Sequence, residues 1–238
     1  MENKARVLRG RVEMIVPTRN GEIRYVSPAI GPDTYVNVGK NILEQGLFVP
    51  TGDYTAPLLN AAYNNPEVAN EPEFMDVREK MKNNWLWVFN RDIWTPKGVY
   101  VVQDTKAEGQ SARFDLNELE DILSGGKTER GVRFSKDGKV RFAPKSSYSL
   151  GVHTPQTLAQ DGFVIANYGI EGAECLGNLA QYFRNRPRTF GLNKTEGEAP
   201  EQRVACLGSD WYGGDWLGVV GGDWGGGDRG GCAFGVSK

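Results

Sequence analysis

The chain has 238 residues, a formal net charge of −2, 39% hydrophobic residues and 24% charged residues. Such a composition is ordinary for a globular protein with one large core or two small ones. The small net charge gives no general attraction to nucleic acid or to anionic membranes. No window approaches the roughly 20 apolar residues of a membrane span, and the N-terminus lacks the apolar run of a secretory signal. We therefore expect a soluble protein that is made in the cytosol, binds no nucleic acid and does not insert into a membrane. If the protein is displayed on a virion or a cell surface, a partner has to carry it there.

Cysteine and histidine are too sparse to indicate a metal site. The three cysteines, Cys175, Cys206 and Cys232, are too few for a disulfide framework and lack metal-ligand spacing. The single histidine, His153, precedes Thr154 and Pro155 and is expected to lie in a loop or at a helix start, not in a catalytic triad. We expect no cofactor, no metal and no enzymatic activity.

The first half of the chain predicts short elements with much irregular backbone between them. Loose alternation indicates a first strand, and Arg19-Asn20-Gly21 indicates a hairpin turn after it. Residues 27–70 are rich in Pro, Gly and Asn and are expected to be mostly irregular. The predicted elements are strands Val7–Val16 and Glu22–Val26, short helices near Val38–Gln45 and Ala56–Tyr63, a helix over Glu73–Asn83, and strands Trp85–Asn90 and Gly98–Gln103. The last two strands are continuously apolar, which is typical of strands covered on both faces.

The second half contains the best-delimited helix of the sequence. Asp115 with Glu118 three residues later forms a capping-box-like start, and Gly125-Gly126 marks the end. The other predicted elements are a hairpin of Val132–Ser135 and Lys139–Ala143, a short helix from Thr154-Pro155 to Gln160, a strand Phe163–Asn167, a helix Gly172–Phe183, and extended segments Thr189–Leu192 and Pro200–Cys206. Short mixed elements of this kind favour an α+β fold over a doubly wound sheet.

The C-terminal stretch from Cys206 to Lys238 combines glycine with large aromatic residues. Between Leu207 and Gly235 lie twelve glycines, three of the six tryptophans and four aspartates. So much glycine opposes helix and uninterrupted strand, because each glycine adds backbone entropy that folding must remove. Flexible linkers, however, lack tryptophan. Apolar anchors on an irregular backbone, separated by small polar residues, are typical of an adaptable binding surface.

The order of features in this stretch resembles the C-type lectin fold. The similarity is to the branch shared by formylglycine-generating enzymes and the variable proteins of diversity-generating retroelements. It rests on Gly222-Asp-Trp224, Arg229-Gly-Gly231 and the terminal Ala233–Val236, and Asp161–Phe183 resembles archaeal and archaeal-virus variable proteins. The resemblance covers about the last third of the chain. It implies a single domain over residues 1–238, of which residues 1–150 carry less of the resemblance. It also implies long irregular Gly- and Trp-rich loops, a variable, ligand-binding region at residues 206–238, and a protein or glycan partner.

In that family a reverse transcriptase miscopies template adenines, so the encoded residues vary while the scaffold stays fixed. Randomised Asn codons ending in a pyrimidine cannot yield Trp, Lys, Glu, Gln or Met, and between Leu207 and Gly235 only the three tryptophans break that rule. On this basis the tryptophans are scaffold. The candidate varied positions are Asp210, Tyr212, Gly213, Gly214, Asp215, Gly225, Gly226, Gly227 and Asp228. The resemblance implies a ligand-binding face of Asp210, Trp211, Tyr212, Gly213, Gly214, Asp215, Trp216, Asp223, Trp224, Gly225, Gly226, Gly227, Asp228 and Arg229.

Three other interpretations remain open at this point. The aspartates offer the oxygens that calcium prefers, but the calcium motifs of sugar-binding C-type lectins are missing. Cys206 and Cys232 could serve as the copper-binding, oxidising pair of a formylglycine-generating-type oxidase, although only Arg229 lies near them as an activating residue. A virion or fibre structural protein without a specific ligand is the third.

Overall fold

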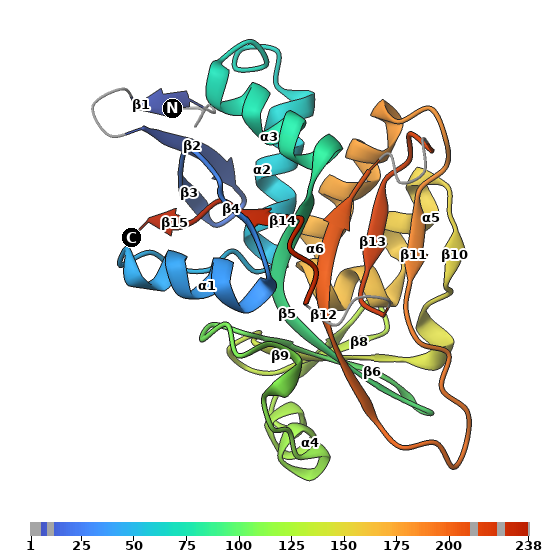
Figure 1. Ribbon diagram of the computed structural model, residues 1–238. Coiled ribbons are helices and arrows are strands. Elements are labelled where there is room, and N and C mark those ends of the chain that lie inside the picture. Colours follow the sequence, from blue (N-terminus) through green and yellow to red (C-terminus); the bar gives the residue numbers. More distant parts are fainter. Residues whose placement is uncertain (1–5, 9–11, 210–213, 223–226, 238) are drawn as a thin grey trace.

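Strand β5 (Trp85–Thr95) lies at the centre of the larger of two sheets (Figure 1). The computed structural model describes residues 6–8, 12–209, 214–222 and 227–237. Strand β5 is apolar along most of its length and is buried on both faces, as expected for this segment. It pairs antiparallel with β12 (Glu201–Gly208) and β6 (Gly98–Gln103), and its first residues pair parallel with β14 (Gly231–Ala233). The strand order is β10 (Gly151–Val152), β11 (Arg188–Phe190), β13 (Gly218–Val220), β12, β5, β6, β9 (Val140–Pro144), β8 (Val132–Phe134) and β7 (Lys127–Glu129), with β4 (Ile30–Asp33) joined through β14.

The smaller sheet joins the two ends of the described chain. Its strand order is β1 (Arg6–Leu8), β2 (Glu13–Thr18), β3 (Gly21–Val26) and β15 (Val236–Ser237). The predicted hairpin at Arg19–Gly21 is confirmed between β2 and β3. The C-terminal strand β15 completes the sheet by pairing with β3, with Val236 opposite the buried Tyr25. Both ends of the chain therefore lie on the same side of the molecule (Figure 1).

Helices cover the sheets, and the longest of them is interrupted. The helices are α1 (Tyr35–Glu44), α2 (Gly52–Asn64), α3 (Pro72–Asn83), α4 (Leu116–Ser124), α5 (Pro155–Gln160) and α6 (Gly162–Leu179), with single 3-10 turns at Gly109–Ser111, Lys145–Ser147 and Ala180–Tyr182. Helix α6 breaks at Gly169, whose φ of 69° suits glycine. It packs closely on α2, because a Cβ on Gly172 would lie only 3.3 Å from the Cβ of Ala56.

Three predictions of secondary structure are wrong. Phe163–Asn167 is the first part of α6 and not a strand; almost every residue there is buried, so hydrophobic periodicity cannot separate helix from strand. The expectation that residues 27–70 are mostly irregular is wrong in extent: the two helices predicted there are confirmed, but they begin earlier, at Tyr35 (α1) and Gly52 (α2), and Pro57 lies within α2. Val7–Val16 is not one strand, since β1 and β2 pair antiparallel with each other.

Other local predictions are confirmed by their capping contacts. Asp115 accepts a hydrogen bond from the Asn117 N–H at the start of α4. Thr154 caps α5 through the Thr157 N–H, and His153 lies buried just before it, with Nε2 2.9 Å from the Thr189 hydroxyl. None of the helices within the described residues combines the length and apolar character needed to cross a lipid bilayer.

A buried carboxyl lies between β5 and α6. The Asn167 side-chain amide donates a hydrogen bond of 2.9 Å to Asp92 Oδ1, and Asp92 Oδ2 has no hydrogen-bond partner among the described residues. Burial raises the pKa of Asp92 well above its ordinary value. A Cβ on Gly221 would collide with Asp92 Oδ2, so this carboxyl lies against the chain where it leaves β13.

The buried carboxyl predicts a pH dependence of stability. The pKa of Asp92 is raised in the folded state. Its contribution to the free energy of unfolding is therefore complete below about pH 4, the pKa of an aspartate in the unfolded chain. This contribution is lost as the pH rises towards the folded-state pKa, by up to about 1.4 kcal/mol per pH unit. Asp92→Asn keeps an acceptor for Asn167 and removes the titration. We therefore expect this variant to lose that decline when urea unfolding is measured from pH 4 to pH 8. Asp121→Asn on the exposed side of α4 is the control, and an Asp92→Asn profile parallel to the wild type would contradict the prediction.

Candidate ligand-binding face

The two ends of the glycine-rich stretch pair with the same residue of β5, one on each side of it. Leu86 of β5 pairs with Leu207 at the end of β12 and, on its other side, with Cys232 of β14. Neighbouring strands lie about 4.8 Å apart, so the two ends of the stretch are held about 10 Å apart. Residues 208–231 therefore form an excursion whose ends are fixed by backbone hydrogen bonds.

Strand β13 divides this excursion into two loops. The first loop (residues 209–217) connects β12 to β13, and the second loop (residues 221–230) connects β13 to β14. The sequence analysis missed β13; its signal is Leu217-Gly-Val-Val220, an apolar run whose side chains are buried. Of the predicted binding face, the structure describes Gly214, Asp215, Trp216, Gly227, Asp228 and Arg229. The remaining predicted residues lie outside the described residues: Asp210, Trp211, Tyr212, Gly213, Asp223, Trp224, Gly225 and Gly226.

The described end of the first loop is hydrogen-bonded to the segment that follows α6. The N–H of Asn185 donates to the carbonyl of Asp215 over 3.0 Å, and its side-chain amide donates to the carbonyl of Gly214 over 2.6 Å. The Asp215 carboxylate accepts from the N–H of Arg184 over 3.3 Å. Asp215 has a φ of 40°, a region that favours Gly, Asn and Asp. Variation at Asp215 stays a prediction, and this geometry favours those three residue types there.

Trp216 is packed as the scaffold interpretation expects, although it is only half-buried. Its ring centroid lies 5.4 Å from that of Phe190, and the guanidinium carbon of Arg188 lies 5.5 Å from the indole. Both contacts come from β11, outside the glycine-rich stretch. Aromatic pairs and cation–π contacts of this kind contribute about 0.5–1.5 kcal/mol each. Trp211 and Trp224 lie outside the described residues, so the same expectation for them stays a prediction.

The described end of the second loop is held at the start of β5. Gly230 donates its N–H to Asp228 Oδ1 over 2.6 Å, and its carbonyl accepts from the Asn84 side chain over 3.0 Å and from the Trp85 N–H over 3.3 Å. The Asp228 carboxylate therefore turns the chain into β14. Like Asp215, Asp228 accepts a backbone N–H, so both of the described loop aspartates help to hold the loop backbone.

The glycines of the stretch fall into two groups that composition cannot separate. A Cβ on Gly221, Gly222 or Gly231 would collide with Asp92, with the backbone of Gly191 or with the Trp87 indole, respectively. Gly227, by contrast, has no described atom within 4 Å of the position of a Cβ. The first three glycines are therefore framework positions, and the described part of the chain leaves room for a side chain at Gly227, whose variation stays a prediction.

This division predicts opposite outcomes for two glycine substitutions. Gly227→Ser adds a side chain in open space and should change the free energy of unfolding by no more than about 0.5 kcal/mol. Gly231→Ala forces the buried Trp87 indole to move and should cost about 1–3 kcal/mol. Urea unfolding of both variants measures the difference. Similar losses for the two would show that the open space around Gly227 does not decide tolerance.

A second matched pair tests Asp215. Asp215→Asn keeps a side-chain acceptor and tolerates positive φ, so its stability should stay close to that of the wild type. Asp215→Val places a β-branched residue at φ 40° and should lose about 1–3 kcal/mol. Thermal unfolding of the two variants is the measurement. Equal melting temperatures would mean that the loop relaxes its backbone without cost.

A groove of about 360 Å³ lies beside the first loop, and the framework forms most of its wall. Ser209 and Asp215 contribute from the loop side, and the Ser209 hydroxyl donates to the carbonyl of Met81. The remaining lining comes from α2, from α3 and from the segment after α6, and consists of Tyr63, Arg78, Glu79, Lys82, Asn83, Tyr182 and Phe183. The sequence analysis missed this wall, because its residues come from three separate segments.

The aromatic part of this wall is ordered by ring contacts. The Tyr63 ring centroid lies 5.7 Å from that of Tyr182 and 5.9 Å from that of Phe183. Tyr182 is 54% exposed, which is high for a tyrosine in an aromatic cluster. Burial raises the pKa of Tyr63 to about 12, and the nearby Asp215 carboxylate adds to the rise. The Tyr63 hydroxyl is therefore protonated at neutral pH and can donate a hydrogen bond.

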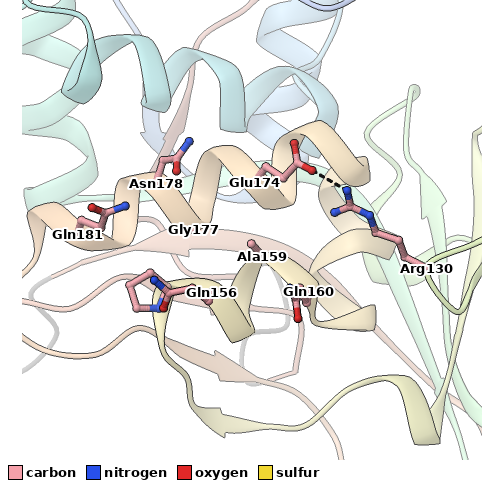
Figure 2. A pocket seen from close by; sticks show the side chains of 9 residues that line it. Arg130, Gln156, Ala159, Gln160, Glu174, Gly177, Asn178 and Gln181 are labelled. Carbon is pink, nitrogen blue, oxygen red and sulfur yellow. Dashed lines mark hydrogen bonds and ion pairs between the residues drawn. The ribbon is translucent and has the colours of Figure 1, made fainter.

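A second concavity, of about 630 Å³, lies between α5 and α6, and none of its described lining residues comes from the glycine-rich stretch (Figure 2). Its polar lining includes the side-chain amides of Gln156, Gln160, Asn178 and Gln181. At one end, Arg130 forms an ion pair of 2.8 Å with Glu174. The floor is narrow, because a Cβ on Gly177 would approach the Cβ of Ala159 to 2.8 Å.

The cysteines of the stretch lie on opposite faces of the larger sheet. Cys206 pairs with Trp87 and packs in the same core cluster, whereas Cys232 pairs with Leu86 and packs in the cluster on the other face. Successive residues of a strand point to opposite faces. Both thiols are buried, and burial raises the pKa of Cys232 to about 12.

Comparison with known proteins identifies the fold. No protein-family model and no curated protein matches the chain. Among solved structures, the chain is similar to a Nanoarchaeota protein reported to accommodate massive sequence variation by the C-type lectin fold. The TM-score is 0.51 at 14% identity, and the match covers 87% of this chain and 93% of that one. The chain has a C-type lectin fold of the α+β class, and the match extends well beyond the C-terminal third that carried the sequence resemblance.

Proposed function

We propose that the chain is a ligand-binding protein that displays a variable C-terminal surface on its C-type lectin scaffold to a protein or glycan partner. The observation that carries this proposal is the pairing of Leu86 with both Leu207 and Cys232. These backbone hydrogen bonds fix the ends of the excursion whatever side chains it carries. Such a scaffold offers new binding surfaces at little cost in stability.

The pattern of residues supports assigning the chain to the variable proteins of diversity-generating retroelements. The structurally similar Nanoarchaeota protein accommodates massive sequence variation, and the stretch from Leu207 to Gly235 has the codon-limited composition expected of adenine mutagenesis. The collision-free position of Gly227 agrees with a varied site, and the packing of Trp216 agrees with a fixed one. Neighbouring DNA tests the assignment: a near-copy of these codons, differing only at adenines and beside a reverse transcriptase gene, is the expected finding.

We also propose that the chain is not an enzyme. A formylglycine-generating-type oxidase would need Cys206 and Cys232 to act together on copper. Their thiols belong to core clusters on opposite faces of the sheet, and the raised pKa of Cys232 disfavours the thiolate that would bind a metal. Both features support a role for these cysteines in packing.

A display experiment tests the binding function directly. One library randomises the nine candidate varied positions with pyrimidine-ending codons, and a control library randomises exposed residues of α4, which lies at the opposite end of the molecule from α3 (Figure 1). Both are sorted for folded display and then against lysozyme and an immobilised high-mannose glycan. We expect the loop library to stay folded and to yield binders with Kd near 1 μM or below, about 8 kcal/mol of binding free energy, and the α4 library to yield none.

Two results of this selection would contradict the proposal. The first is a loop library that no longer folds, because the excursion would then not be independent of its side chains. The second is equal enrichment of binders from the α4 library, because the loops would then have no special capacity for recognition.

A further inference from the structure

The framework beside the first loop carries exposed positive charge. Arg184 and Arg186 lie between α6 and β11, and Arg188 is the first residue of β11; all three are exposed, whereas Pro187 and Thr189 are buried. Within the described part of the chain, the guanidinium groups of Arg184 and Arg186 make no hydrogen bond or ion pair. Arg188 lies against the Trp216 ring. Two guanidinium groups are therefore available to a partner.

Backbone hydrogen bonds hold this arginine segment against the loop. Besides the bonds from Arg184 and Asn185 to the loop, the N–H of Arg188 donates to the carbonyl of Leu217 over 2.8 Å. Most of these acceptors are backbone carbonyls, which every loop sequence possesses. The arginines should therefore border the first loop in every variant of the protein.

The same charge continues into the groove. Arg78 and Lys82 line it together with Tyr63 and Tyr182, and among the described residues Glu79 and Asp215 balance their charge. Arg78 is fixed in place, because it donates to the carbonyls of Ala62 and Ala69. With Arg184, Arg186 and Arg188 beside the groove, five basic side chains stand against these two acidic ones, in a chain whose net charge is −2. Arginine and tyrosine are also the residues that most often dominate binding energy at protein interfaces.

We propose that this basic–aromatic rim, made of Tyr63, Arg78, Lys82, Tyr182, Arg184, Arg186 and Arg188, binds an acidic polypeptide segment of the partner. The proposal rests on the proposed binding function and adds that the rim supplies affinity shared by all variants, while the loop side chains select the partner. Arginine donates in a planar fork that matches a carboxylate. A long polyanion would also meet the remaining, net negative surface, whereas a short acidic segment meets only the rim.

Fluorescence anisotropy with a labelled short Glu-Gly repeat peptide tests this inference. We expect saturable binding that weakens with added salt, and no binding of a Gln-Gly peptide of equal length. Arg184→Gln with Arg186→Gln should weaken binding of the Glu-Gly peptide about tenfold or more, because the variant loses charge-assisted hydrogen bonds to the peptide carboxylates. Lys106→Gln with Lys136→Gln removes the same charge from exposed sites outside the rim and should leave the affinity within about twofold. The Arg184→Lys, Arg186→Lys variant should bind the Glu-Gly peptide more tightly than the double Gln variant but more weakly than the wild type.

The outcomes separate this inference from the proposed function. Loop variants taken from the display library should bind different partners but should all keep the affinity for the Glu-Gly peptide. This result would support a rim that all variants share. Absence of Glu-Gly binding, or equal loss in both double variants, would overturn the inference even if the loop library yields binders. Tighter binding of heparin or of a single-stranded oligonucleotide through the same two arginines would overturn the polypeptide assignment. Glu-Gly binding without any library binders would leave the rim standing and reject the variable surface.

Discussion

The structure depends on the hydrogen bonding of β5 on both sides of its first residues. Strand β5 is buried along nearly its whole length, so its backbone groups must find partners within the protein. At Leu86 those partners are Leu207 and Cys232, which come from the two ends of the glycine-rich excursion. The requirement that β5 be paired thus holds the excursion in place. Backbone groups of the strands thus hold the ends of the excursion, and within it the side chains of Asp215, Trp216 and Asp228 add contacts of their own.

The sequence analysis succeeded where a local rule decides the structure. The caps at Asp115 and Thr154 and the turn at Arg19–Gly21 need only neighbouring residues, and all three are confirmed. It failed where tertiary burial removes the local signal. Phe163–Asn167 is buried all round in α6, so its apolar run has no helical periodicity. The C-type lectin fold was predicted from the C-terminal third because the distinctive residues lie there, whereas the strand order of the remainder depends on long-range pairing.

The candidate site was predictable only in its glycine-rich half. Glycine and tryptophan mark the excursion in the sequence, but the framework wall takes Tyr63 from α2, Arg78 from α3 and Tyr182 from the turn after α6. No spacing rule brings three such segments together. Composition also conceals that glycine has two uses in the excursion. At Gly231 it lets the backbone approach the Trp87 indole, whereas no described neighbour requires glycine at position 227.

The pairing of β15 has a consequence for how the chain is made. Val236 and Ser237 follow the whole excursion in the chain, yet they pair with β3, and Val236 also bridges to Phe48. Both sheets therefore remain incomplete until synthesis has passed the whole excursion. A chain that ends anywhere within residues 208–230 would lack both β14 and β15. The truncated product would expose the edges of β3 and β5, which are targets for aggregation and proteolysis. The order of strands thus makes folding depend on translation through the whole excursion.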